Sequence, residues 1–130
     1  VQANELGTDY DTIEIRGSGT FNAADVAATK KLKVKFAGTT IFDSGAVVVA
    51  VATPWVVQCS ITRKSSTEVV YSCTMNIGNM TLAFTYASEG VLTGLTLSNS
   101  NTIQFTGECS SATNDEIKQR CLTPKWFGGG

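Results

Sequence analysis

The sequence predicts an all-β protein, an antiparallel sandwich or barrel of about eight strands with a short disulfide-pinned C-terminal helix. Apolar and polar residues alternate with a period of two over most of residues 55–109, as they do in half-buried strands. Turn-forming residues interrupt the alternation at short intervals, which is typical of sandwiches and barrels. The 130 residues are enough for one domain with its own core.

We expect this single domain, residues 1–130, to consist of four parts. They are an N-terminal arm at 1–10, antiparallel strands at 11–109, a short helix at 113–122 and a tail at 123–130. The first strand follows from Ile13 and Ile15, which alternate with polar neighbours. The glycines of Gly17-Ser18-Gly19 are expected to end this strand.

A row of lysines marks the next predicted strand. Lys31, Lys33 and Lys35 alternate with apolar residues, so one face of the strand is cationic and the other apolar. One interpretation is an exposed strand, for example at a sheet edge, where lysines prevent pairing with another chain. The other interpretation is a binding patch for an anionic partner.

Residues 46–52 form the longest apolar run of the chain and are apolar on both faces. Such a run is typical of a strand in the middle of a structure. It would cross the core of a sandwich, or a partner subunit would cover its outer face. The second possibility implies a subunit interface.

Five alternating runs between residues 55 and 107 predict five consecutive antiparallel strands. The runs 69–77 and 80–86 are separated by Gly78-Asn79, which favours a two-residue primed turn. This turn would place Ile77 opposite Met80. The next connection is expected at 87–90, ahead of a strand at 91–97.

The four cysteines favour two disulfides over a metal site, because no Cys-x-x-Cys pair and no histidine is present. A hairpin centred near Ser66 would place Cys59 opposite Cys73. The second local pairing joins Cys109 to Cys121, and the sequence leaves the other connectivities open. Disulfides imply an oxidising location, so we expect a secreted protein that is extracellular or periplasmic.

The predicted C-terminal helix rests on its capping pattern. Thr113 stands three residues before Glu116, as in a capping box. Acidic residues lie in the first turn and basic residues in the last, which suits the helix dipole. The bridge from Cys109 to Cys121 would pin this helix to the last strand.

The absence of histidine limits the available chemistry. It excludes Ser-His-Asp and Cys-His catalysis and the usual catalytic zinc sites. Bridged cysteines would offer no thiol, and the carboxylates Asp9 and Asp11 are expected to be solvated residues before a strand. We therefore expect no enzyme, no cofactor and no metal.

The charge and the hydropathy of the chain argue against nucleic acid and a membrane span as partners. With a net charge of −1 the chain has no field to attract nucleic acid. Its apolar runs are shorter than the roughly 20 residues of a membrane span, so none is expected. Because the chain begins with Val, we expect a mature product whose export signal has been removed.

Three features are candidates for contact with other molecules. Trp126 and Phe127 in the tail would either cap the β structure or dock on a partner. The lysine row would bind an anion under its second interpretation. Asn79 begins the pattern Asn-Met-Thr and is a candidate for N-glycosylation.

The expected function is that of a non-catalytic recognition domain for an extracellular protein or glycan. A structural subunit of an extracellular assembly, such as a fimbria, pilus or coat, is the alternative, since the run 46–52 and the low charge suit self-association. A strand meander followed by a disulfide-linked helix is also similar in architecture to lipocalin barrels, although their Gly-x-Trp signature is missing. This similarity implies a further alternative, a barrel carrier of a small apolar ligand.

Overall fold

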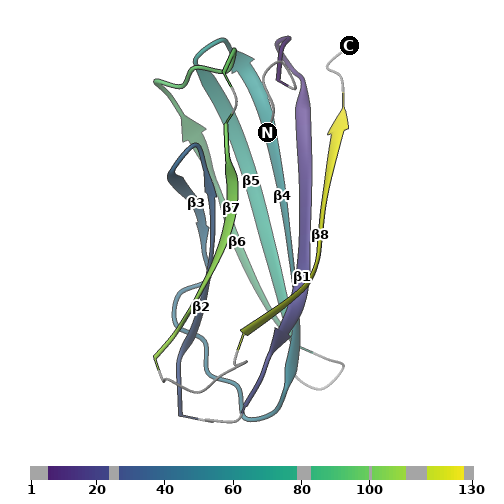
Figure 1. Cartoon of the computed structure of the whole chain (residues 1–130), viewed down its shortest axis with the longest axis vertical. Helices are drawn as coiled ribbons and strands as arrows, with labels where there is room; N and C mark the ends of the chain where they lie inside the picture. The colour runs from purple at the N-terminus through teal and green to yellow at the C-terminus, as the bar shows by residue number, and fades with distance from the viewer. Residues whose placement is uncertain (1–5, 24–26, 79–82, 100, 111–116, 128–130) are drawn as a thin grey trace.

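The computed structural model is a sandwich of two antiparallel β-sheets (Figure 1). It describes residues 6–23, 27–78, 83–99, 101–110 and 117–127. For residues 83–86 and 118–127 it describes the backbone alone. The eight strands are β1 (Thr12–Phe21), β2 (Lys30–Phe36), β3 (Thr39–Asp43), β4 (Thr53–Ser65), β5 (Glu68–Gly78), β6 (Ala83–Leu92), β7 (Ile103–Cys109) and β8 (Ile117–Phe127).

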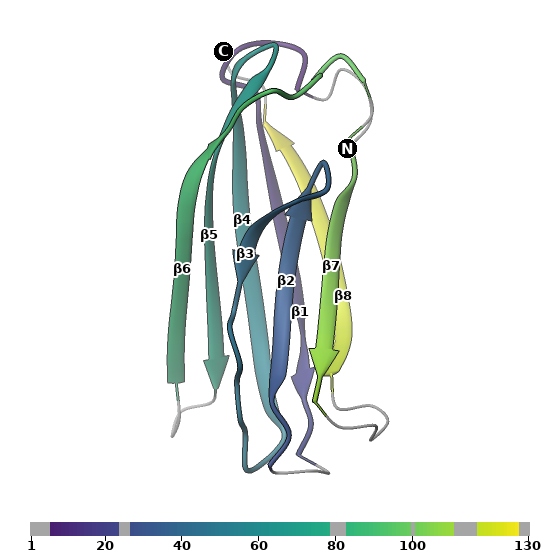
Figure 2. The same ribbon diagram turned by 90° about the vertical axis from the view of Figure 1, so that its left-hand side faces the viewer.

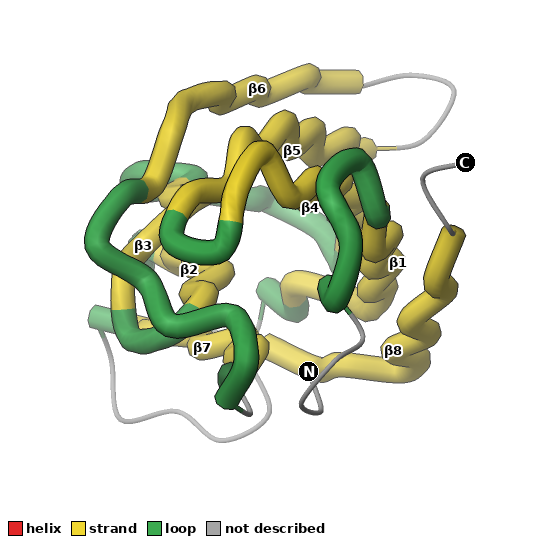
Figure 3. Tube along the Cα trace, turned by 90° about the horizontal axis from the view of Figure 1, so that it is seen from above, coloured by secondary structure: helices red, strands yellow, loops and turns green. Residues whose placement is uncertain are grey.

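The two sheets differ in width. The five-stranded sheet has the order β6-β5-β4-β1-β8 and the three-stranded sheet the order β3-β2-β7. Figure 2 shows the narrow sheet in front of the wide one, and Figure 3 shows the strands around a common core. Among the described residues β3 approaches β6 and β7 approaches β8 without ladder pairing. The fold is therefore a sandwich, and the barrel alternative is wrong.

The alternating pattern of the central strands is confirmed. In β4 the side chains of Trp55, Val57, Cys59 and Ile61 are buried at 1% exposure or less. In β5 the residues Val69, Cys73, Met75 and Ile77 are buried in the same way. Leu32, Val34 and Phe36 of β2 close the core from the other sheet. Because large apolar side chains dominate this inner layer, burial of the two facing sheets is the main stabilising term.

The predicted turn between β5 and β6 is wrong. Ile77 pairs with Phe84 and Gly78 pairs with Ala83, so the second strand is shifted by four residues from the predicted register. An even shift leaves every residue on the same face of the sheet. The alternation that predicted the strands therefore does not distinguish the two registers.

The predicted end of the first strand at Gly17-Ser18-Gly19 is also wrong, since β1 continues to Phe21. Gly17 is on the inner face, and a Cβ atom there would overlap the ring of Phe105 from β7. The glycine is thus required by a close approach between the two sheets. It does not mark a turn.

The apolar run 46–52 is not a strand. It connects β3 to β4 and forms one bridge, between Val47 and Lys30. Val47 and Val49 are buried, whereas Val48 and Val51 are 56% and 54% exposed. The run therefore crosses between the sheets with one side in the core, and the prediction of a central strand is wrong.

The last predicted strands of the meander are arranged differently from expected. Residues 87–90, predicted as a loop, belong to β6, which ends at Leu92. The residues that follow cross to the narrow sheet, with Leu97 buried on the way at 2% exposure. Of the five strands predicted to be consecutive neighbours from residue 55 onward, only β4, β5 and β6 are, because β7 pairs with β2.

The helix predicted at 113–122 is not present in the described part of this segment. Residues 117–127 form β8, which pairs with β1 from Phe21↔Ile117 to Thr12↔Phe127, so most of the predicted tail is strand as well. Residues 113–116, which carry the capping box, lie outside the described residues. A helix of about nine residues is marginal alone, and pairing along β1 overrides its local signals. Pro124 is compatible with β8 because one side of an edge strand makes no ladder bonds.

The predicted pairing of Cys59 with Cys73 across β4 and β5 is confirmed at the level of register. A hydrogen bond to Cys73 and burial together raise the pKa of the Cys59 thiol. Hydrogen bonds from Cys59 and Ser88 lower the pKa of the Cys73 thiol, against the effect of burial. The two cysteines are thus buried cross-strand neighbours, and the covalent bridge between them stays a prediction.

The first prediction concerns this cysteine pair. Replacing Cys59 and Cys73 together by alanine should lower the free energy of unfolding by about 2–4 kcal/mol, because the bridge restricts the unfolded chain. Urea unfolding measures the loss. Reductant should destabilise the unmodified protein by more than it destabilises the double variant, which retains only the predicted bridge between Cys109 and Cys121. Non-reducing peptide mapping that joins Cys59 to Cys109 or Cys121 would contradict the pairing.

The second prediction concerns the contact between Gly17 and Phe105. Gly17→Ala should lower the free energy of unfolding by about 1–3 kcal/mol, because the added methyl group overpacks the core. Ser18→Ala, on the other face of β1, is the matched control and should change stability by less than about 0.5 kcal/mol. Phe105→Leu should cost less in the Gly17→Ala background than alone. Equal stability of Gly17→Ala and the unmodified protein would rule out the close approach.

Candidate functional site

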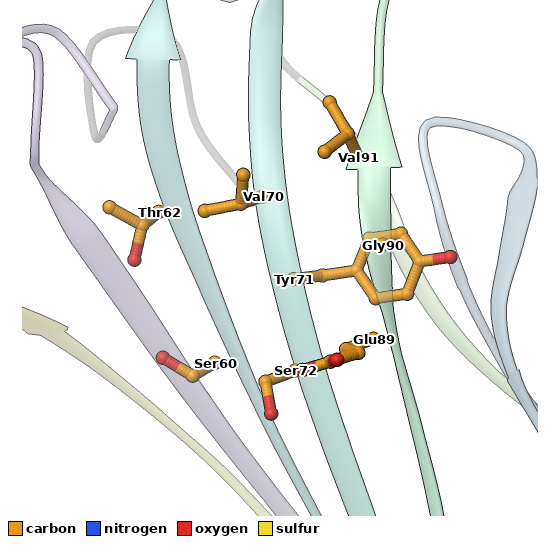
Figure 4. A pocket seen from close by; sticks show the side chains of 8 residues that line it. All are labelled: Ser60, Thr62, Val70, Tyr71, Ser72, Glu89, Gly90 and Val91. Carbon is orange, nitrogen blue, oxygen red and sulfur yellow. The ribbon is translucent and has the colours of Figure 1, made fainter.

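The candidate site is a groove on the outer face of the five-stranded sheet, over β4, β5 and β6 (Figure 4). The groove has a volume of about 490 Å³. Its lining combines hydroxyl groups, one carboxylate and apolar side chains, from Ser60, Thr62, Val70, Tyr71, Ser72, Glu89, Gly90 and Val91.

The strand register arranges the lining in two rows. Ser60, Ser72 and Glu89 are cross-strand neighbours in one row. Thr62, Val70 and Val91 are neighbours in the next row along the strands. Because residues directly opposite each other lie about 4.5–5.5 Å apart, each row forms a continuous strip across three strands.

Beneath the groove, at the edge strand, a tyrosine packs on the inner side of the sheet. Tyr71 pairs with Gly90, and its ring lies across that glycine in Figure 4. A Cβ atom at Gly90 would come within 2.6 Å of the Tyr71 hydroxyl oxygen. The ring thus occupies the space of the missing side chain, as in aromatic rescue of an edge glycine. Tyr71 is half-buried against the core.

Both rows of the groove continue onto the neighbouring strand β1. Thr12 and Thr62 share a hydrogen bond of 2.9 Å between their hydroxyl oxygens. Glu14 pairs with Ser60, so the row runs from Glu14 at one side to Glu89 at the other. Three strand spacings separate these two carboxylates by roughly 14 Å. This exceeds the separation of about 5–9.5 Å in the carboxylate pairs of glycosidases.

The chemistry of the groove suits neutral, polar ligands. Hydroxyl side chains both donate and accept hydrogen bonds, and an ionised carboxylate accepts them from several donors. Val91 is 53% exposed and offers an apolar surface beside these groups. The groove can therefore bind a molecule that presents hydroxyl groups next to apolar patches.

The lysine row lies on the other sheet. Lys31, Lys33 and Lys35 belong to β2, which is the middle strand of the narrow sheet, so the prediction of an edge strand is wrong. All three side chains are partly buried. The amino group of Lys33 lies 4.0 Å from Asp43 and 3.7 Å from Glu108. Acidic residues of both neighbouring strands thus reduce the positive field of the row.

The other predicted contact residues are not brought into the groove. Trp126 and Phe127 pair through their backbones with Ile13 and Thr12 at the end of β8, and their side chains are outside the described part of the structure. Asn79 also lies outside the described residues. Whether it carries a glycan stays a prediction.

The remaining cysteines and the N-terminal carboxylates have structural surroundings. Cys109 pairs with Lys30 at the end of β7, and Cys121 pairs through its backbone with Ser18, so their bridge stays a prediction. Asp9 accepts a hydrogen bond of 2.9 Å from the Arg63 guanidinium. Asp11 is buried and accepts one of 2.7 Å from the Thr8 amide. Asp9 is exposed, as expected of a solvated residue before a strand, whereas the expectation of a solvated Asp11 is wrong because that side chain is buried.

Sequence reasoning missed the groove, although part of its signal is present. The outer faces of the runs in β4 and β5 are rich in Ser and Thr, and Glu89 is the only charged residue between Val69 and Gly107. Glu89 was expected in a loop, and it lies in β6 beside Ser72. The register of β6 therefore decides which residues form the site.

Two further searches of the described residues bear on the kind of site. No group of three or more Cys, Asp or Glu side chains in this part of the chain is arranged to hold a metal ion. Across the same residues no helix has the length and apolar character needed to cross a membrane.

Comparison of the chain with protein-family models, with curated proteins and with solved structures gave no match.

Proposed function

We propose that the chain is a secreted, non-catalytic recognition domain that binds a glycan in the groove over β4, β5 and β6. The observation that carries the proposal is the strip of Ser60, Ser72 and Glu89 beside the strip of Thr62, Val70 and Val91. A sugar ring presents hydroxyl groups at its rim and C–H groups on its faces. The strip of Ser60, Ser72 and Glu89 offers hydrogen-bonding partners for the hydroxyl groups. The neighbouring strip offers an apolar surface for the C–H groups.

The position of the groove on strands supports binding without large rearrangement. Both strips lie on neighbouring strands of one sheet, and the Tyr71 ring covers Gly90 on the edge strand. Side chains held on rigid elements lose little conformational entropy when a ligand binds. Weak individual hydrogen bonds can then add to a specific affinity.

The third prediction tests the groove directly. After a glycan array has identified a ligand, Ser72→Ala and Glu89→Gln should each weaken its binding by about tenfold, because each removes a polar contact. Isothermal titration calorimetry measures the affinities.

Matched controls lie one row away on the same face. Gln58 and Thr74 are exposed cross-strand neighbours outside the groove. Gln58→Ala and Thr74→Ala should leave glycan affinity unchanged. If these controls weaken binding as much as the groove variants, the ligand does not occupy the groove, and an array without any bound glycan would contradict the proposal.

A structural subunit of an extracellular assembly is the second candidate. Its support is the exposure of Val48 and Val51, two apolar side chains on the connector between β3 and β4. Exposed apolar side chains can take part in contacts between subunits.

The fourth prediction separates the two candidates. As a recognition domain the chain should remain a monomer at millimolar concentration in size-exclusion chromatography with light scattering. Concentration-dependent oligomers that disappear in Val48→Ser/Val51→Ser would favour the structural subunit. Lys64→Ser, at an exposed position of β4, is the control for a general effect of surface changes.

A further inference from the structure

The pairing of β1 with β4 continues past the groove. Thr62 is the groove residue closest to the end of β4 (Figure 4). Beyond it, the Tyr10 amide donates a hydrogen bond of 2.8 Å to the Arg63 carbonyl. The Arg63 amide donates one of 2.9 Å to the Asp11 carbonyl. Tyr10 is thus held beside the end of β4, one step along the strands from the hydrogen-bonded hydroxyls of Thr12 and Thr62.

An exposed aromatic ring and an ammonium group meet at this position. The Tyr10 side chain is 63% exposed, and the Lys64 Nζ lies 5.3 Å from the centre of its ring. Lys64 follows Thr62 by two residues, which is the spacing of side chains on one face of a strand. It also lies in a bulge of β4, between Arg63 and Ser65. Bulges commonly redirect a side chain next to a binding site.

The backbone of Tyr10 adopts a conformation that is uncommon for an aromatic residue. Its φ angle is +73°, in the left-handed region. Residues held there cost free energy and are concentrated at functional positions. The Arg63 guanidinium fixes the preceding segment, because it donates hydrogen bonds to Asp9 at 2.9 Å and to the Leu6 carbonyl at 2.8 Å. The exposed ring is therefore presented by a segment that is held in place.

The charge of Lys64 is available to a ligand. Among the described residues Lys64 forms no ion pair, either with Glu68 across the hairpin or with any other acidic residue. Asp9 is paired with Arg63 instead. The rows of Lys64 and Glu89 differ by four residues along the strands, and two strand spacings separate β4 from β6, which together give roughly 17 Å. The groove thus has a cationic end and an anionic end.

We propose that Tyr10 and Lys64 form a second subsite of the groove, which binds a sugar of the uronic-acid class at one end of a glycan. The Tyr10 ring stacks on the C–H face of this sugar, and the Lys64 ammonium binds its carboxylate. The charge of Glu89 repels a carboxylate at the other end, so the glycan binds in one direction. This inference rests on the proposed glycan binding by the groove and adds the class of its ligand.

The fifth prediction compares acidic glycans with uncharged forms of the same molecules. An array presents uronic-acid oligosaccharides beside their methyl esters, and isothermal titration calorimetry measures the best-bound pair. At about 50 mM salt the acid should bind about fivefold more tightly than the ester, because only the acid pairs with Lys64. This preference should decrease at about 500 mM salt, since exposed charges are then screened.

Variants with matched controls isolate the two subsite residues. Lys64→Gln should remove the preference for the acid and leave the affinity for the ester unchanged. Arg16→Gln removes the same charge from an exposed position of β1 outside the groove, and the preference should remain. Tyr10→Asn should weaken acid and ester alike by about tenfold, because it removes the ring and tolerates the left-handed backbone. Tyr10→Phe keeps the ring and should bind both forms as the unmodified protein does.

Failure of the subsite and failure of the groove give different results. If Ser72→Ala weakens the ester while Lys64→Gln keeps the preference for the acid, the groove binds glycans and the subsite is wrong. Loss of the preference in Arg16→Gln as well would show an effect of overall charge and overturn the subsite. Equal competition by poly-L-glutamate would identify an acidic peptide as the partner and also overturn it. If no glycan binds in either form, the proposed function fails and this inference fails with it.

Discussion

The arrangement of the core and of the candidate groove depends on the strand β4, which has one face in each of them. It is the middle strand of the wide sheet, and β5 and β1 pair with its two edges. Its inward residues Trp55 and Cys59 are buried in the core, whereas Ser60 on its outer side lines the groove. A slip of β4 by one residue would exchange these faces and disrupt both the core and the groove.

The positions of most strands and their buried residues were predictable from the sequence. Which strands pair with each other was mostly not predictable. The register of Cys59 with Cys73 followed from alternation and a short polar tip, since both are local signals. The strand β8 pairs with β1 across nearly the whole chain, and a capping box says nothing about such a distant partner. At Gly17 a turn signal was in fact a packing requirement imposed by Phe105. Tertiary contacts decided each of these cases.

The candidate groove was predictable only as a composition. The sequence showed a polar face of Ser and Thr on β4 and β5. Whether Glu89 lies beside this face depends on how β6 is aligned with β5. For the lysine row, the predicted alternation of lysines and buried residues was right. The predicted position at a sheet edge was wrong, because β2 is a middle strand. Sites on a sheet surface are thus specified by pairing as much as by residue type.

The pairing of Tyr71 with Gly90 has a consequence for folding. The hairpin of β5 and β6 could also form four residues out of register with all its polar and apolar faces correct, and Tyr71 would then be opposite Tyr86. Only the native alignment gives the Tyr71 ring a glycine to cover. The hydrophobic pattern fits both hairpins equally well, so this contact favours the native alignment over the shifted one.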